Sequence, residues 1–75
     1  MEREPIMDKN KLYRALQIVQ DDAKNRELYY ISEQQKLPPS GWSREKHVSY
    51  CQQEIDEATA TQHYCFIRMA QLSPD

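Results

Sequence analysis

The feature that most constrains the fold of this sequence is an apolar repeat between Ser43 and Leu72. Small and apolar residues recur there in alternating steps of three and four, at Val48, Cys51, Ile55, Ala58, Gln62, Cys65, Met69 and Leu72. Gln62 is the polar exception. Because such steps return to one face of an α-helix, the repeat predicts a long helix with a narrow apolar stripe over residues 43–72.

A second helical segment precedes the repeat. Asp8 can act as its N-cap, and no Gly or Pro occurs between Lys9 and Lys36, so we expect a helix over residues 8–36. Its less regular inward stripe is predicted to consist of Leu12, Leu16, Val19, Ala23, Arg26, Tyr30, Glu33 and Leu37. Residues 1–7 are charged and contain Pro5, which predicts a flexible lead-in.

The two helices are separated by a connector over residues 37–42. It contains Pro38, Pro39 and the only glycine, Gly41, and it is followed by Ser43, a suitable N-cap. Helices of similar length joined by a short connector pack antiparallel. The chain is therefore predicted to be all-α, with one coiled-coil-like helical-hairpin domain over residues 8–75.

The centre of this hairpin is expected to be narrow. In an antiparallel register set by the connector, Ala23 lies opposite Ala58 and Val19 lies opposite Gln62. Small residues let helix axes approach closely, so the middle of the hairpin should be thin and tightly packed.

Both helices also carry large apolar residues outside this stripe. A chain of 75 residues buries too little surface for a comfortable core of its own. We therefore expect a second interface, most simply a homodimer that forms a four-helix bundle, with a different protein as the alternative. The candidate protein-binding residues are Ile18, Leu28, Tyr29, Tyr50, Tyr64, Phe66 and Ile67.

Composition narrows the choice of partner and compartment. The net charge of −2 argues against both a general nucleic-acid clamp and an acidic DNA mimic. The sequence shows neither an apolar signal core at Met1–Pro5 nor a run of about 18 apolar residues. We expect a cytoplasmic protein without a membrane partner, in which the two cysteines are free thiols.

Few residues suggest chemistry. Cys51 and Cys65 lie roughly 21 Å apart on one helix, too far to bond to each other, so packing is favoured over a redox role. His47 and Cys51 have a spacing that could present two metal ligands, but no further motif completes a zinc site. Phosphate loops and nucleophile elbows are absent from the sequence. We predict no enzyme activity, no metal and no cofactor.

The aromatic residues near the connector allow two interpretations. Trp42, Tyr29, Tyr30 and Tyr50 should converge there with the two prolines. Trp42 is expected to plug the hairpin turn, whereas the tyrosines could equally serve as packing residues or as a recognition hot spot.

Basic residues offer an alternative function. Lys9, Lys11, Arg14 and Arg68 should gather at the open end of the hairpin, where they could contact phosphates in RNA or DNA. In length and layout the chain is similar to Rop-like RNA-modulating hairpins, which dimerise into four-helix bundles, although no motif is shared.

The leading hypothesis is a small non-enzymatic regulator or inhibitor that binds a protein. Small size and the absence of catalytic motifs are also typical of phage or plasmid accessory proteins that modulate a host protein. Nucleic-acid binding through the basic residues remains the alternative.

Overall fold

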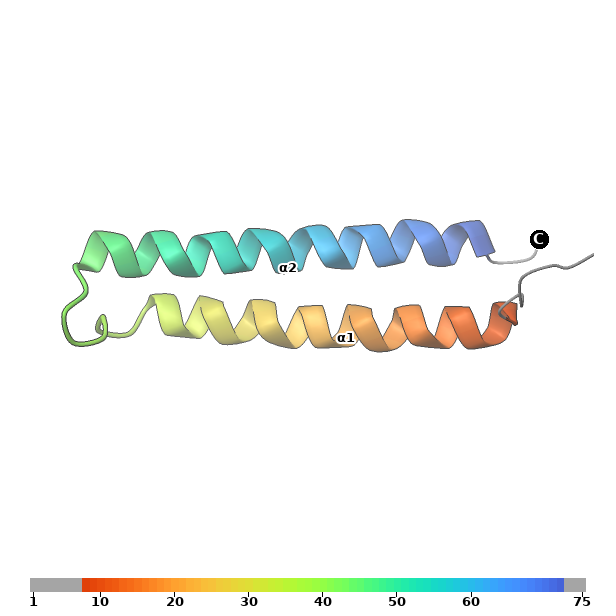
Figure 1. Ribbon diagram of the computed structural model, residues 1–75, viewed down its shortest axis with the longest axis horizontal. Coiled ribbons are helices and arrows are strands. Elements are labelled where there is room, and N and C mark those ends of the chain that lie inside the picture. The colour runs from red at the N-terminus through yellow and green to blue at the C-terminus, as the bar shows by residue number, and fades with distance from the viewer. Residues whose placement is uncertain (1–7, 73–75) are drawn as a thin grey trace, which may run out of the picture.

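The structure is a computed structural model that describes residues 8–72. It contains two helices, α1 (Lys9–Gln34) and α2 (Arg44–Leu72), which run antiparallel along their whole lengths (Figure 1). No strand occurs in this part of the chain. The prediction of an all-α two-helix hairpin is confirmed, whereas the predicted lead-in over residues 1–7 lies outside the described residues.

Side-chain caps fix where both helices begin. The Asp8 carboxylate accepts a hydrogen bond from the Asn10 backbone N–H at 3.1 Å, and the Ser43 hydroxyl accepts one from the Lys46 backbone N–H at 3.0 Å. Each cap pairs an N–H group that has no partner within its own helix. The connector then turns at Gly41, whose φ of +86° lies in the left-handed region that favours glycine.

The core is one stripe of small and medium residues on α2. Ala58 is fully buried, Cys51 and Cys65 are each 1% exposed, and Ile55 and Met69 are also buried. In α1 only Ala23 reaches this degree of burial. The most deeply buried positions are occupied by alanine and cysteine, the small residues of the predicted stripe. Neither helix has a stretch long and apolar enough to cross a membrane within the described residues.

The predicted inward stripe of α1 is partly wrong. Val19 is 46% exposed, Leu37 is 85% exposed and Arg26 is exposed as well. Three polar residues turn toward α2 in their place, half-buried at a spacing of seven: Gln20, Glu27 and Gln34.

Hydrogen bonds between the helices explain this rotation of α1. Gln62, the polar member of the α2 stripe, donates to a Glu27 carboxylate oxygen at 2.7 Å. Gln34 donates to the Val48 backbone carbonyl at 3.0 Å. A half-buried amide is costly without a partner, and Val19 offers Gln62 none. Polar pairing therefore decides which face of α1 turns inward.

Candidate functional site

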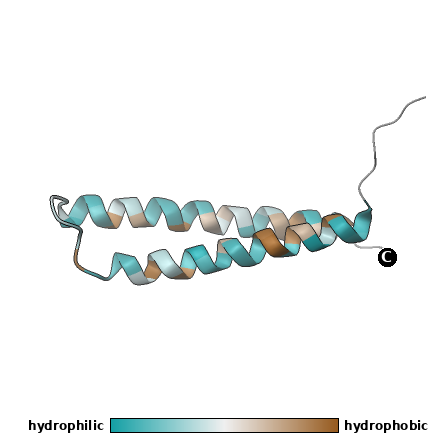
Figure 2. Ribbon diagram, turned by 60° about the horizontal axis from the view of Figure 1, so that its bottom comes forward, coloured by the Kyte–Doolittle hydropathy of each residue, from teal (hydrophilic) through white to brown (hydrophobic). Residues whose placement is uncertain are grey.

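All seven candidate protein-binding residues are exposed in the hairpin. Tyr64 and Phe66 are about 60% exposed, and the other five range down to 41% for Tyr50 and Ile67. Four of them, Ile18, Tyr64, Phe66 and Ile67, lie in the half of the hairpin nearer the chain ends; we call these four the terminal apolar group. Figure 2 shows hydrophobic segments of both helices in this half.

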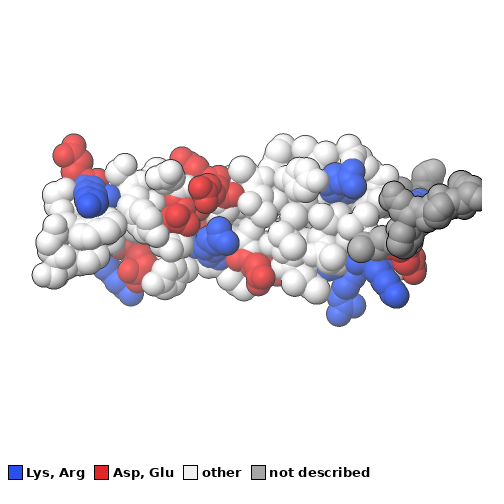
Figure 3. All heavy atoms as spheres, viewed as in Figure 1, with Lys and Arg blue, Asp and Glu red and all other residues white. Residues whose placement is uncertain are grey.

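Two further exposed residues lie near the terminal apolar group. Val19, which was predicted to face inward, is next to Ile18, and Tyr13 lies one and a half turns before it. The sequence pattern placed Val19 in the inner stripe because steps of three and four from Leu12 and Leu16 lead to it. Charge is sparse in the same half of α2, where Figure 3 shows mostly uncharged atoms around one basic side chain and acidic side chains nearer the middle.

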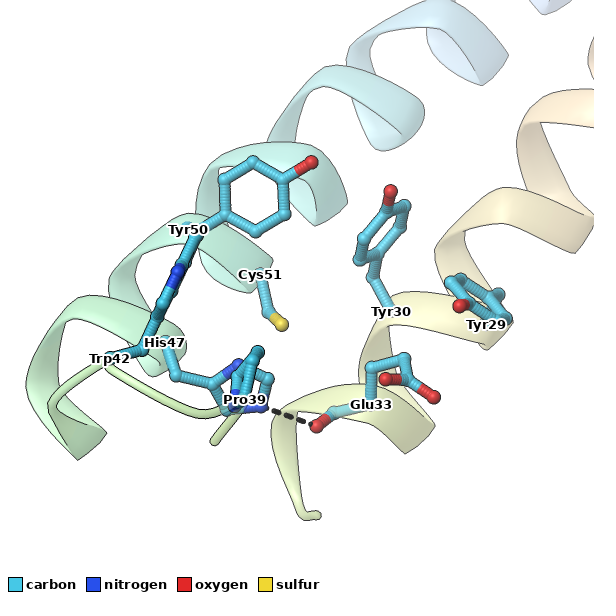
Figure 4. Close-up of a pocket in the computed structure, with 8 residues that line it drawn as sticks. All are labelled: Tyr29, Tyr30, Glu33, Pro39, Trp42, His47, Tyr50 and Cys51. Atoms are coloured by element: carbon cyan, nitrogen blue, oxygen red, sulfur yellow. Dashed lines mark hydrogen bonds between the residues drawn. The ribbon is translucent and has the colours of Figure 1, made fainter. Parts of the chain in front are cut away.

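A pocket of about 360 Å³ opens at the connector end. Figure 4 shows that its walls come from three segments: the last turns of α1, the connector and the first turns of α2. The residues that line this pocket are Tyr29, Tyr30, Glu33, Pro39, Trp42, His47, Tyr50 and Cys51. The aromatic residues converge here as predicted, whereas the cavity was not predicted from the sequence.

The four aromatic rings of the pocket form a continuous row. The centroids of Tyr29 and Tyr30 are 5.0 Å apart, those of Tyr30 and Tyr50 are 6.0 Å apart, and those of Tyr50 and Trp42 are 5.6 Å apart. Successive rings meet at 77–86°, the edge-to-face arrangement that aromatic pairs favour. Tyr50 is thus both an exposed residue and a packing partner of Trp42.

Two buried residues of α2 line the pocket beneath these rings. His47 is 5% exposed, and its Nε2 lies 2.8 Å from the Glu33 backbone carbonyl oxygen. Cys51, one turn further on, is a free thiol whose pKa is raised by burial and, to a lesser degree, by the carboxylates of Glu33 and Glu54. Such a thiol stays protonated and unreactive at neutral pH.

The His47–Cys51 pair has no surrounding ligand set. Within residues 8–72, three or more histidine, cysteine or acidic side chains do not come together in a group that could hold a metal ion. The imidazole instead bonds to the end of α1. Burial and the hydrogen bond from His47 to Glu33 account for both residues without a catalytic or metal-binding role.

Charged groups at the pocket entrance are arranged around Glu33 and Trp42. The Glu33 carboxylate accepts a hydrogen bond from the Lys36 ammonium at 2.9 Å, which raises the pKa of Lys36. The Lys46 ammonium lies 4.6 Å from the centroid of the Trp42 ring, within range of a cation–π interaction. The side chain of Tyr50 is the main cause that raises the pKa of Tyr30 to about 12.

The four basic residues of the alternative hypothesis all lie in the described part of the chain. Lys9, Lys11 and Arg14 are exposed on the first turns of α1. Arg68 is half-buried, and its guanidinium donates to the Gln71 side chain at 3.2 Å. Because a guanidinium has five N–H donors, Arg68 keeps donors besides the one given to Gln71, and all four residues remain candidates for phosphate contact.

No protein-family model matches this sequence, and comparisons with curated proteins and with solved structures gave no match. The hairpin itself offers two candidate binding features: the exposed apolar residues and the aromatic pocket.

Proposed function

We propose that this protein is a non-enzymatic, cytoplasmic regulator or inhibitor that binds another protein through its exposed apolar residues. The observation that carries the proposal is the exposure of all seven candidates, from 41% to 62%, on a hairpin whose own buried residues are mostly alanine and cysteine. Covering exposed apolar surface with a partner lowers the free energy by about 25 cal/mol per Å² removed from water. A surface of this kind favours association.

Self-association is the simplest way to cover part of this surface. Two hairpins that pack through the terminal apolar group would form a four-helix bundle, with the small central residues left within each hairpin. A stable interface of this type buries about 1,200–2,000 Å² in total. We propose that the homodimer meets the partner protein through those exposed apolar residues that the dimer interface leaves uncovered.

Sedimentation equilibrium tests the dimer. We expect a mass twice that of the 9.0 kDa chain, and a monomer when both Phe66 and Ile67 are changed to serine. Gln53→Ser, an exposed polar change on the same helix, should leave the mass unchanged. A mass of 9.0 kDa at every concentration would contradict self-association.

Capture experiments test the partner interaction. The chain is used as bait in an extract of its native cell, alongside the Ala variants of Tyr29, Tyr50, Tyr64 and Phe66. We expect unchanged helicity with loss of the captured protein, because truncation removes apolar contacts without touching the buried stripe. Thr59→Ala is the matched exposed control. Full capture by all four variants would refute the proposal.

Nucleic-acid binding is the second candidate, and one observation favours it. Lys9, Lys11 and Arg14 are exposed close together in α1, near the open end of the hairpin. Contacts between these cations and phosphates would give an affinity that falls steeply with salt concentration. A gel shift that is absent, or insensitive to salt, would exclude this function, and loss of the shift in Lys11→Gln and Arg14→Gln would support it.

A further inference from the structure

The connector-end pocket combines π faces with one carboxylate, and this combination suits an organic cation. We propose that the pocket binds a methylated ammonium group, carried by a small quaternary ammonium compound or by a methylated lysine. This inference goes beyond the protein-binding function and does not depend on it. The volume of about 360 Å³ lies at the lower end of the range for small-molecule sites.

The aromatic walls supply the attraction. Four rings line the pocket, and each is turned by 77–86° from the next, so the cavity is bounded by rings that face in different directions. The negative face of an aromatic ring attracts a cation within about 6 Å of its centroid. Trp42 already holds one cation in this way, the Lys46 ammonium at 4.6 Å.

The acceptors that line the pocket include the tyrosine hydroxyls and the groups of Glu33, and those of Glu33 are mostly engaged. A primary ammonium needs acceptors for three N–H groups, and burial without them is costly. The Glu33 backbone carbonyl is engaged by His47, and one carboxylate oxygen of Glu33 is engaged by Lys36. Within the described residues, the other carboxylate oxygen, Oε1, has no hydrogen-bond partner. A trimethylammonium group needs only this negative charge and the rings.

Two resident lysines should limit the affinity. Lys36 neutralises much of the Glu33 charge, and Lys46 occupies Trp42. Lys36 is largely exposed, so its ammonium can move away at little cost. Lys36→Gln and Lys46→Gln are therefore expected to strengthen cation binding, whereas Glu33→Gln is expected to weaken it.

Trp42 is the only tryptophan in the chain, so its fluorescence reports on the pocket directly. The folded protein is titrated with choline, with N-acetyl-trimethyllysine amide, and with 3,3-dimethylbutan-1-ol. In this alcohol, which we call dimethylbutanol, a tert-butyl group replaces the trimethylammonium group of choline. We expect saturable quenching by the two cations and binding of the isostere that is at least about fivefold weaker, the scale of a cation–π contribution. The tighter of the two cations identifies the source of the group.

Variants of charged residues show whether choline binds in this pocket. Glu33→Gln should weaken choline binding by about fivefold, a ratio typical of one partly exposed charge contact. Glu57→Gln, an exposed change roughly 15 Å along α2 from His47, is the matched control and should have no effect. Equal affinity for dimethylbutanol, an unaffected Glu33→Gln variant, or no saturable quenching by either cation would each overturn the proposal.

Discussion

The imidazole Nε2 of His47 lies 2.8 Å from the backbone carbonyl oxygen of Glu33, so a buried side chain of α2 closes the last turn of α1. A carbonyl oxygen can only accept, which means that Nε2 carries the hydrogen. The last carbonyls of a helix have no partner within it. This bond therefore joins the end of α1 to the beginning of α2 and shapes the pocket between them.

Replacement of His47 should loosen the connector end. His47→Ala removes a buried hydrogen bond and leaves a cavity, so we expect the free energy of unfolding to fall by about 1–3 kcal/mol. Urea unfolding followed by circular dichroism measures this change. The exposed His63→Ala variant should stay within about 0.5 kcal/mol of the parent. Equal effects of the two variants would show that the His47 bond contributes nothing.

Tyr30 should ionise at unusually high pH. Its pKa is raised from 10.0 to about 12, chiefly by the Tyr50 side chain. Because the folded state holds the phenolic proton more tightly, this stabilisation is complete below the ordinary pKa of 10.0 and is lost as the pH rises through about 12.

An NMR titration of the tyrosine ring carbons checks this prediction. Tyr50→Phe should bring the pKa of Tyr30 back toward its ordinary value, whereas Tyr64→Phe, an exposed change on the same helix, should not. A Tyr30 pKa near 10.0 in the parent protein would show that the Tyr50 side chain does not hold the phenolic proton of Tyr30.

The cysteines should be nearly inert while the protein is folded. Cys51 and Cys65 are each 1% exposed, and burial raises the pKa of Cys51 further. Since the thiolate is the reactive form, labelling with an aromatic disulfide reagent is expected to be slow until urea unfolds the chain. Fast labelling of either thiol in the folded protein would contradict this prediction and support a redox role for that cysteine.

The centre of the hairpin should reject large residues. Ala58 is fully buried between the helices, whereas Ala60 is exposed two residues away. Ala58→Leu should destabilise the protein by about 1–3 kcal/mol through overpacking. Ala60→Leu changes the same atoms at an exposed helical site and should be near neutral, which thermal unfolding of both variants can show.

The fold could be predicted because its signals are local. The three- and four-residue steps of α2, the caps Asp8 and Ser43, and the break at Pro38–Gly41 each act within a few residues. The inner face of α1 was harder to predict. The steps of three and four selected Val19, which is exposed, whereas Glu27 turns toward α2 and accepts a hydrogen bond from Gln62.

The pocket was predictable only in outline. Convergence of Trp42 and the tyrosines follows from the hairpin itself. The inward position of Glu33 was also predicted, but the bond from His47 to its backbone carbonyl was not. This bond has no sequence signal, since it joins residues that are 14 positions apart in the chain.

Photo-crosslinking in the native cell tests the central claim, that the exposed apolar residues are a protein interface. A photoreactive phenylalanine analogue is placed at Phe66, or at the exposed polar position Gln53 as the matched control. We predict a discrete covalent adduct with a second protein chain from position 66 and none from position 53. No adduct from position 66, or equal adducts from both positions, would contradict the account.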